Sequence, residues 1–452
     1  MFAGAFGGGV APCGHCGTRA PGGGPAVPKR GRLDRKQKDR KSYSNETQGS
    51  DLRFHPTRNH FRGKVGQERA CDVILCEDGP GGVPALFDGA ERLVLAHSLD
   101  QVAPALADLD AARAAGKWVA GYLAYEAGYA FEPRLAALMP DKMGGPLVAF
   151  GVYAGPQDAG PILAQASALA PGVSLSPLVP VINRTAYGAA FERVKSYIAA
   201  GDCYQINLTF PMTTQMSGGR ALGLYGALMA EQSVRHGAFV DLGVGAVLVS
   251  RSPELFLRID ADGRIETRPM KGTAPRDADP VRDAELAEQL RASSKGQAEN
   301  LMIVDLLRND IARVSRIGSV KVPKLFAVES YATVHQMVST VVGQLMDAPS
   351  MVGVMAALFP CGSITGAPKI RAMQIIREVE PHARGPYCGA IGWMAPDGAA
   401  RFNVAIRTMQ VAPDSSVILN VGGGIVHDST AHGEWEEALW KARYAQRLVR
   451  RT

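Results

Sequence analysis

Short runs of apolar residues, bounded by turn-forming residues, mark where the regular hydrophobic pattern of this chain begins. Residues 72–75, 93–97 and 118–125 carry branched, aromatic and leucine side chains over the length of one strand, so they predict β-strands. Residues 101–115 are rich in alanine and predict a helix before the third strand. Residues 156–182 are rich in Pro, Gly and Ala, which indicates a connection rather than a boundary between domains.

The rest of the pattern groups strands and helices instead of alternating them. A helix at 188–200 leads through a turn at 201–204 into a strand. The elements predicted after it are strands near 236–259 and 264–269, helices near 283–290 and 295–314, a helix after Pro368, and strands at 388–395, 401–411 and 416–421. Because a doubly wound sheet needs strict alternation, this grouping predicts an α+β fold with large mixed or antiparallel sheets.

Charge divides the chain near residue 70. Residues 1–70 hold 14 Lys and Arg against 5 Asp and Glu, so they carry more than the whole net charge of +6. They lack apolar periodicity, and we expect a disordered basic extension. No aromatic residues are interleaved in the basic runs at 29–41, which favours an extension without a role over a nucleic-acid arm or a targeting segment. The remainder divides into an N-terminal part, 71–182, and a region at 183–452 that holds the candidate chemistry.

Composition also predicts where the protein resides. No stretch approaches the ~20 apolar residues of a membrane span, and no secretory signal opens the chain, so we expect a cytoplasmic protein without a membrane partner. Seven cysteines are an odd number, which argues against a disulfide framework. Cys13 and Cys16 have half of a zinc-site spacing, but no second pair follows them. Cys203, Cys361 and Cys388 are expected to be small buried hydrophobes.

Lys271, in the segment 268–276, is the first candidate for chemistry. A lysine amine attacks carbon only when it is neutral. A nucleophilic lysine must therefore lie where burial or neighbouring positive charge lowers its pKa. An ordinary solvated lysine is the alternative, and this segment alone does not exclude it.

A carboxylate lies early in an apolar helix predicted for residues 294–310. Ser294 and Gln297 have the spacing of a capping box, and Glu299 follows them. A carboxylate so placed needs either a basic partner or a metal ion. The helix alone leaves both possibilities open.

A second helix, predicted for residues 433–442, brings further charged side chains together. Glu434, Glu437 and Lys441 lie at positions i, i+3 and i+7, on one helix face. With Glu299, the two carboxylates would form an oxygen-rich site without Cys or His, which is the type that suits Mg²⁺. A solvated acidic helix start is the alternative.

Two further segments are suited to anions. In residues 360–371, glycines and hydroxyls precede a helix whose first turn would hold Pro368, and this arrangement favours anion binding. Arg407, predicted in a strand, and a glycine turn at 421–425 could each bind a carboxylate. Together the segments predict a small dianionic substrate, held by Arg407, backbone amides and Mg²⁺ near a lysine.

These segments resemble the chorismate-utilising enzymes. The resemblance is carried by residues 252–254, 268–276, 298–310, 362–371 and 422–441, and it covers most of residues 183–445. It implies the α+β fold of that family, with helices packed outside large antiparallel or mixed sheets in one compact domain. It also implies chorismate as the substrate and Mg²⁺ as the cofactor.

The same resemblance assigns roles to individual residues. It implies that Lys271 is the nucleophile and that Glu254 protonates the departing 4-hydroxyl. The residues implied to bind the substrate are Gln205, Thr365, Tyr387, Arg407, Gly422, Gly423 and Lys441, and those implied to bind the metal are Glu299, Glu434 and Glu437.

Within the family, the chain is similar to the branch that aminates chorismate at C4 for 4-aminobenzoate and folate synthesis. Isochorismate and salicylate synthases use a lysine to activate water where this chain has Gln205, and a neutral amide cannot act as that base. Anthranilate synthases usually carry alanine at Lys271 and histidine at Gln336, although His335 is adjacent here.

The chain has no Cys-His glutaminase signature, so the resemblance implies ammonia supplied by a separate glutamine amidotransferase subunit. The alternatives are the large subunit of an anthranilate synthase and, in another class, a chorismate-binding regulatory protein without turnover.

Overall fold

The computed structural model describes residues 72–331, 334–346 and 350–449. The basic extension at 1–70 and the Cys13 and Cys16 pair lie outside these residues, so what we expect of them stays a prediction. The described elements all belong to one unit, Asn59–Thr452. Among the described residues, no helix is long and apolar enough to cross a membrane.

The first of two large sheets, sheet 1, has eleven strands. Its order is β17-β9-β21-β20-β11-β10-β1-β2-β6, and β7 and β8 also pair with β9. The neighbouring strands are antiparallel. The strands are β1 Val73–Cys76, β2 Ala85–Phe87, β6 Gln157–Asp158, β7 Ser174–Leu175, β8 Val179–Pro180, β9 Gln205–Gly218, β10 His236–Asp241, β11 Val247–Ser252, β17 Gly366–Ala367, β20 Thr408–Val411 and β21 Ser416–Ile425.

Sheet 2 has ten strands, also antiparallel. Its order is β14-β16-β13-β12-β19-β18-β4-β5-β3, and β15 also pairs with β16. The strands are β3 Arg92–Ala96, β4 Trp118–Leu123, β5 Val148–Tyr153, β12 Leu255–Ile259, β13 Arg264–Thr267, β14 Met270–Pro275, β15 Lys321–Ser330, β16 Val334–Gln344, β18 Ala390–Met394 and β19 Ala400–Val404.

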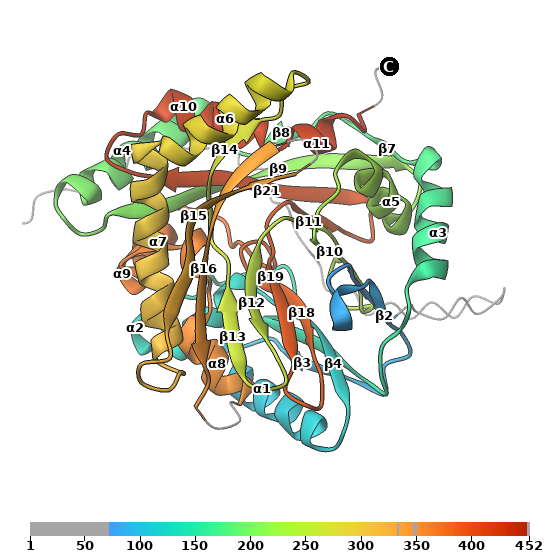
Figure 1. The fold of residues 1–452 in the computed structure, drawn as a ribbon. Helices are drawn as coiled ribbons and strands as arrows, with labels where there is room; N and C mark the ends of the chain where they lie inside the picture. Colours follow the sequence, from blue (N-terminus) through green and yellow to red (C-terminus); the bar gives the residue numbers. More distant parts are fainter. Residues whose placement is uncertain (1–71, 332–333, 347–349, 450–452) are drawn as a thin grey trace, which may run out of the picture. The chain divides into compact units, whose positions relative to one another are not determined.

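Each sheet packs one face against the other sheet and the opposite face against helices (Figure 1). Ile74 of sheet 1 and Trp393 of sheet 2 belong to the core between the sheets. The helices on sheet 1 are α3 Gly160–Leu169, α4 Arg184–Ala199, α5 Ala221–Glu231, α9 Lys369–Val379, α10 Ala431–Trp440 and α11 Arg443–Gln446. Those on sheet 2 are α1 Leu99–Ala114, α2 Pro133–Ala136, α7 Ser294–Ala312 and α8 Met351–Leu358, while α6, Pro280–Ala292, follows β14. The predicted α+β fold with outer helices is confirmed.

The chain passes between the sheets at two points that hydrogen-bond to each other. From β11 of sheet 1 it continues through Glu254 into β12 of sheet 2, and from β19 of sheet 2 it returns through Arg407 to β20 of sheet 1. The amide of Val404 donates to the Glu254 carbonyl, and that of Arg251 donates to the Arg407 carbonyl, both over 3.0 Å. Two predicted site residues therefore lie on paired crossings between the sheets.

Several local predictions were wrong. The connection predicted at 156–182 contains α3, which begins with Pro161 in its first turn and buries Ala166. Helix α7 is capped by Ser293, whose Oγ accepts a hydrogen bond from the Gly296 amide over 3.1 Å. Gln297 donates to the Arg291 carbonyl instead of completing a capping box. Pro368 is the residue before α9 rather than part of its first turn.

The glycines at 422–424 form part of a strand, not a turn. They lie in β21, paired with Asn207, Leu208 and Thr209 of β9. Arg407 lies between strands, with a φ of 50°, and not inside one as predicted. Both errors arise because the partner strands are distant in sequence, so local pattern does not reveal them.

Candidate active site

A cavity of about 810 Å³ is lined by β14 of sheet 2, β21 of sheet 1, and helices α7 and α10. These elements come from four separate parts of the chain. In Figure 1, β14, α10, one end of β21 and the upper part of α7 lie together at the upper left. The predicted residues that line the cavity are Glu254, Lys271, Glu299, Tyr387, Arg407, Gly422, Gly423, Glu434, Glu437 and Lys441. The structure therefore brings most of the predicted site into one place.

Lys271 enters the cavity from an irregular part of β14. The pairing of β14 with β16 shifts register between Met270 and Thr273, and Gly272 has a φ of 84°. A bulge of this kind redirects a side chain from the face that strict alternation would give it. Burial lowers the pKa of Lys271, the charge of Lys441 acts in the same direction, and the charges of Glu299 and other nearby carboxylates oppose them.

Glu254 is buried at the crossing between β11 and β12, with 5% of its surface exposed. Burial raises the pKa of Glu254 to about 7, although a hydrogen bond from Ser363 and the charges of Lys271 and Arg407 oppose this rise. Its Oε1 has no hydrogen-bond partner among the described residues. A carboxyl group that is partly protonated at neutral pH can serve as a general acid.

The three carboxylates predicted to bind metal are already engaged by other groups. The Ser429 hydroxyl donates to Glu434 over 2.6 Å, and Lys295 Nζ lies 3.9 Å from Glu299 Oε1. Lys441 Nζ contacts Glu437 Oε1 over 2.8 Å and donates to the Gly422 carbonyl over 2.8 Å.

The two carboxylates of α10 consequently differ. Burial raises the pKa of Glu434. Burial also acts to raise the pKa of Glu437, but the charge and hydrogen bond of Lys441 outweigh it and hold this pKa below its ordinary value.

The donor set fits Mg²⁺ in its chemistry but does not converge on one point. Glu299, Glu434 and Glu437 face one cavity and supply only oxygen, as Mg²⁺ prefers. Within residues 72–331, 334–346 and 350–449, however, no three acidic, His or Cys side chains are close enough to hold a metal ion. One oxygen of Glu437, Oε1, is already engaged by Lys441.

Arg407 and Tyr387 contribute a guanidinium group and a hydroxyl group to the lining of the cavity. Arg407 has no hydrogen-bond or ion-pair partner for its guanidinium among the described residues, and burial lowers its pKa. Tyr387 is buried, which raises its pKa well above the ordinary value, so its hydroxyl stays protonated. A half-buried, unpaired arginine and a neutral hydroxyl in the lining of one cavity are groups suited to a carboxylate ligand.

Gln205 and Thr365 are not among the side chains that line the cavity. The Thr365 hydroxyl donates to the carbonyls of Cys361 and Gly362, 3.2 Å away in each case. The Gln205 amide lies behind Gly424, where an added Cβ would come within 3.1 Å of it and within 3.4 Å of Lys271 Nζ. Neither polar atom of the Gln205 side chain has a hydrogen-bond partner among the described residues.

Some lining residues were missed by sequence reasoning. Asn207 and Ser363 line the cavity, and Asn207 stands two positions after Gln205 in β9. Because alternate residues of a strand lie on the same face, the choice of Gln205 as a site residue could have been extended to Asn207. Ser363 belongs to the predicted anion-binding segment at 360–371, although Thr365 was the residue chosen from it.

His335 points away from the cavity, whereas Gln336 lines it. The two ring nitrogens of His335 contact Ser330 Oγ and Asp283 Oδ1, both at 2.8 Å. Gln336 donates to Thr273 Oγ1 over 3.4 Å. The histidine next to Gln336 is therefore a structural link between α6, β15 and β16.

The buried cysteines were predicted correctly. Cys203, Cys361 and Cys388 are buried and not bonded in disulfides, and burial raises the pKa of each thiol. They have the character of small hydrophobes rather than of nucleophiles.

Comparison with known proteins agrees with this geometry. A family model described as chorismate binding enzyme matches residues 75–447. The chain is 44% identical over 260 residues to aminodeoxychorismate synthase component 1 of Salmonella typhimurium, a match covering 58% of this chain and 56% of that protein. It is 42% identical over 260 residues to anthranilate synthase component 1 of Streptomyces coelicolor, covering 57% and 50%. The matches span about half the length of these relatives.

The fold of this chain also matches the folds of solved protein structures. Anthranilate synthase component I from Streptococcus pneumoniae superposes with a TM-score of 0.67 at 24% identity, covering 86% of this chain and 95% of that one.

Proposed function

The chain belongs to the family of chorismate binding enzymes, and from that premise we propose that it is aminodeoxychorismate synthase component 1. It would convert chorismate and ammonia to 4-amino-4-deoxychorismate and water. The main support for the proposal is that Lys271 and Glu254 line one cavity. The pKa of Lys271 is lowered there, and that of Glu254 is raised to about 7. Neutral amine and protonated acid are the forms that a covalent substitution requires.

The substrate would be bound through its two carboxylates. The guanidinium of Arg407 and the hydroxyl of Tyr387, which line the same cavity, would offer donors to one of these carboxylates. Lys441 and the backbone at Gly422 and Gly423 offer a second positive and polar region beside α10. Glu299, Glu434 and Glu437 would hold Mg²⁺, which when bound would polarise the ring carboxylate.

The reaction would then proceed in two substitutions. The neutral amine of Lys271 attacks C2 and forms a C–N bond, both ring double bonds shift by one position, to C6=C1 and C4=C5, and the C4–O bond breaks. Glu254 gives its proton to the departing hydroxyl, which leaves as water. Ammonia then attacks C4, both double bonds shift back, and the C2–N bond to Lys271 breaks, restoring the free lysine, while the proton lost from the new amine returns to the Glu254 carboxylate. Two steps replace one difficult displacement, which is the benefit of covalent catalysis.

The partner and location are part of the proposal. A separate glutamine amidotransferase subunit would supply the ammonia, and support comes from relatives whose name numbers them as a first component. We place the reaction in the cytoplasm on the composition of the sequence.

The main alternative is anthranilate synthesis. It is favoured by the similarity to anthranilate synthase component 1 and opposed by Gln336, which lines the cavity where that branch usually has histidine. His335 does not replace it, because its ring bonds to Asp283 and Ser330 outside the cavity.

One assay distinguishes these functions. The purified full chain would be incubated with chorismate, Mg²⁺ and ammonium, and the products identified by mass spectrometry. Aminodeoxychorismate is the expected product. Anthranilate or isochorismate would assign another branch, and the absence of any product, with chorismate bound, would indicate a regulatory protein.

A further inference from the structure

Tyr387 reaches the candidate active site from a tight turn at residues 384–389. Two residues of this turn, Gly385 and Cys388, have positive φ angles of 59° and 60°. Glycine adopts this conformation freely, whereas cysteine adopts it only where the surrounding structure holds the backbone. Tyr387 lies between these two residues, is buried, and lines the cavity that contains Lys271. The position of its side chain therefore depends on what holds the turn.

A buried carboxylate holds the first half of this turn. Glu126 lies in a 3₁₀ helix, η2 (Tyr125–Phe131), and accepts hydrogen bonds from two successive amides. The Arg384 amide donates to Oε1 over 2.7 Å, and the Gly385 amide donates to Oε2 over 3.0 Å. The Tyr125 amide donates to the Gly385 carbonyl over 2.8 Å. Helix η2 thus binds both the N–H and the C=O group of Gly385.

Backbone hydrogen bonds hold the second half of the turn. The Cys388 amide donates to the Ala405 carbonyl over 3.0 Å, and the Ala405 amide donates to the Gly389 carbonyl over 2.9 Å. Ala405 lies on the crossing from β19 to β20 that also carries a predicted site residue. Tyr387 is therefore enclosed between the part of the turn that Glu126 binds and the part that pairs with this crossing.

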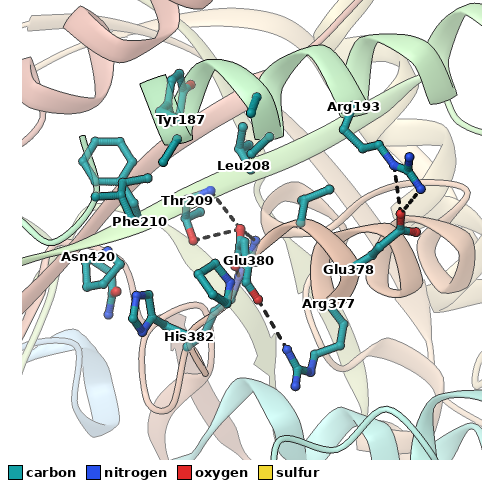
Figure 2. A pocket seen from close by; sticks show the side chains of 18 of the residues that line it. Tyr187, Arg193, Leu208, Thr209, Phe210, Arg377, Glu378, Glu380, His382 and Asn420 are labelled. Carbon is teal, nitrogen blue, oxygen red and sulfur yellow. Dashed lines mark hydrogen bonds and ion pairs between the residues drawn. The ribbon is translucent and has the colours of Figure 1, made fainter. Parts of the chain in front are cut away.

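The Arg384 side chain anchors the start of the turn to sheet 1. It binds the Glu380 carboxylate with hydrogen bonds of 2.9 and 2.7 Å, and it donates to the Asn207 carbonyl over 2.6 Å. Figure 2 shows Glu380 reaching Thr209 of β9, whose amide donates to it over 2.8 Å, in a second cavity of about 550 Å³. The turn therefore starts from a fixed point on β9, and Glu126 fixes the two peptide groups on either side of Arg384.

The carboxylate of Glu126 is unfavourable for stability where it lies. Burial raises the pKa of Glu126 to about 7, although the two amides and the charge of Arg384 oppose this rise. An apolar side chain would avoid the cost of burying a charge, but it would leave both amides without a partner. A buried charge that orders an active-site turn favours a functional reason for the carboxylate over a stabilising one.

We infer that Glu126 is a positioning residue, which holds the turn at residues 384–389 so that the Tyr387 hydroxyl is directed at the substrate in the cavity. Both carboxylate oxygens are needed, because each amide takes one of them. A carboxamide of the same shape could accept only one of these bonds, since its NH₂ group would face the N–H of the other amide. The inference rests on the proposed function in taking Tyr387 as a ligand of the substrate.

The test measures the dissociation constant of chorismate for Glu126→Gln, Tyr387→Phe and the double variant. Each would be titrated by calorimetry in Lys271→Ala protein with Mg²⁺ present, because no adduct forms without this lysine. Tyr387→Phe should weaken binding about 10- to 100-fold, the size expected for a hydrogen bond to a carboxylate. Glu126→Gln should weaken it about 10-fold. The double variant should bind as Tyr387→Phe does, because both changes remove the same hydrogen bond.

Glu378→Gln is the matched control, because Glu378 forms an exposed ion pair with Arg193 at the second cavity (Figure 2). It should leave the dissociation constant unchanged. If Glu126→Gln does not fold, Glu126→Asp tests the same link, because the shorter side chain cannot reach both amides. Glu126→Asp should also weaken binding, and it should add nothing to the effect of Tyr387→Phe.

A folded Glu126 variant with unchanged affinity would overturn the positioning role, and so would a double variant in which the two losses of affinity add. If Tyr387→Phe alone has no effect, Tyr387 is not a ligand and the inference fails with it. The product assay identifies the reaction without using either residue, so failure of the inference is distinguishable from failure of the proposed function.

Discussion

At the scale of single residues, the cavity moves two ionisable groups towards their neutral forms. Burial lowers the pKa of the Lys271 amine and raises that of the Glu254 carboxyl to about 7. Opposite charges nearby limit both shifts, because each group stabilises the charged form of the other. The result is a carboxyl group that is partly protonated near neutral pH and an amine that loses its proton more readily than a solvated lysine does.

Lys271 should become covalently attached to chorismate when ammonia is withheld, because no second nucleophile is then present to release it. Intact-protein mass spectrometry should show the mass of chorismate minus water, and peptide mapping should place it on Lys271. Lys271→Arg should give no adduct, since arginine stays protonated. Lys117→Arg, at a surface ion pair with Glu91, is the control and should form the adduct normally. An adduct on another lysine would reject the assignment.

Glu254 should destabilise the fold at alkaline pH. Its pKa rises from 4.5 to about 7 on folding, so the cost of burying the charge is absent below pH 4.5, grows between these values and is complete above 7. Relative to the unmodified protein, Glu254→Gln should gain about 3 kcal/mol in free energy of unfolding between acidic and alkaline pH. Urea unfolding of both proteins at acidic and at alkaline pH measures this. The prediction is contradicted if the free energies of unfolding of the two proteins differ by the same amount at both pH values.

At the scale of elements, strand β21 shows why glycine was needed beside the reacting groups. An added Cβ at Gly424 would reach the Gln205 amide and Lys271 Nζ, whereas one at Gly422 would lie 2.3 Å from the Leu208 carbonyl oxygen. The first position leaves space for the site, and the second allows the two strands to approach.

The substitutions Gly424→Ala and Gly422→Ala should therefore fail in different ways. Gly424→Ala should lower turnover while the thermal midpoint changes little, because the methyl group meets the movable ends of side chains. Gly422→Ala should cost about 1–3 kcal/mol of stability, because its methyl group meets backbone. Thermal unfolding and turnover of both variants test this, and equal loss of stability in the two would contradict it.

Helices α7 and α10 carry the proposed metal ligands. Replacing Glu299 or Glu437 with Gln should abolish Mg²⁺-dependent turnover in a folded protein, because three carboxylates from two helices are needed to hold the ion. Turnover and Mg²⁺ binding by calorimetry, each measured against Mg²⁺ concentration, are the readouts. A variant that responds to Mg²⁺ like the unmodified protein would show that its glutamate is not a ligand.

Sequence reasoning worked best where structure is local. The face shared by Glu434, Glu437 and Lys441 follows from helical spacing alone, and α10 has that face. The position of Arg407 does not follow from its own segment, because the chain changes sheets there. Thr365 had the right residue type for a substrate contact, yet packing turned its hydroxyl to the carbonyls of Cys361 and Gly362.

At the scale of the whole molecule, the site depends on both sheets and on helices far apart in sequence. The α+β class was predictable, because the order of strands and helices already excluded a doubly wound sheet. The pairing of β9 with β21 was not, since it joins residues about two hundred positions apart and depends on contacts that no local pattern encodes.

Deleting residues 1–70 should leave ammonia-dependent activity intact. The family match begins at residue 75, and the basic excess of residues 1–70 leaves few apolar side chains to bury. The measurement is turnover and solubility of a chain that starts near Cys71, compared with the full chain. A large loss of either would show that the extension contributes to the folded protein.

The paired crossings between the sheets make the site sensitive to shear. Glu254 and Arg407 lie on segments that each begin in one sheet and end in the other, and backbone hydrogen bonds join these segments. If one sheet slid over the other, the relative positions of the Glu254 and Arg407 side chains would change. This would happen before the core between either sheet and its outer helices became exposed. Activity should therefore report on sliding between the layers, and mild denaturant should stop turnover while the helices are still folded.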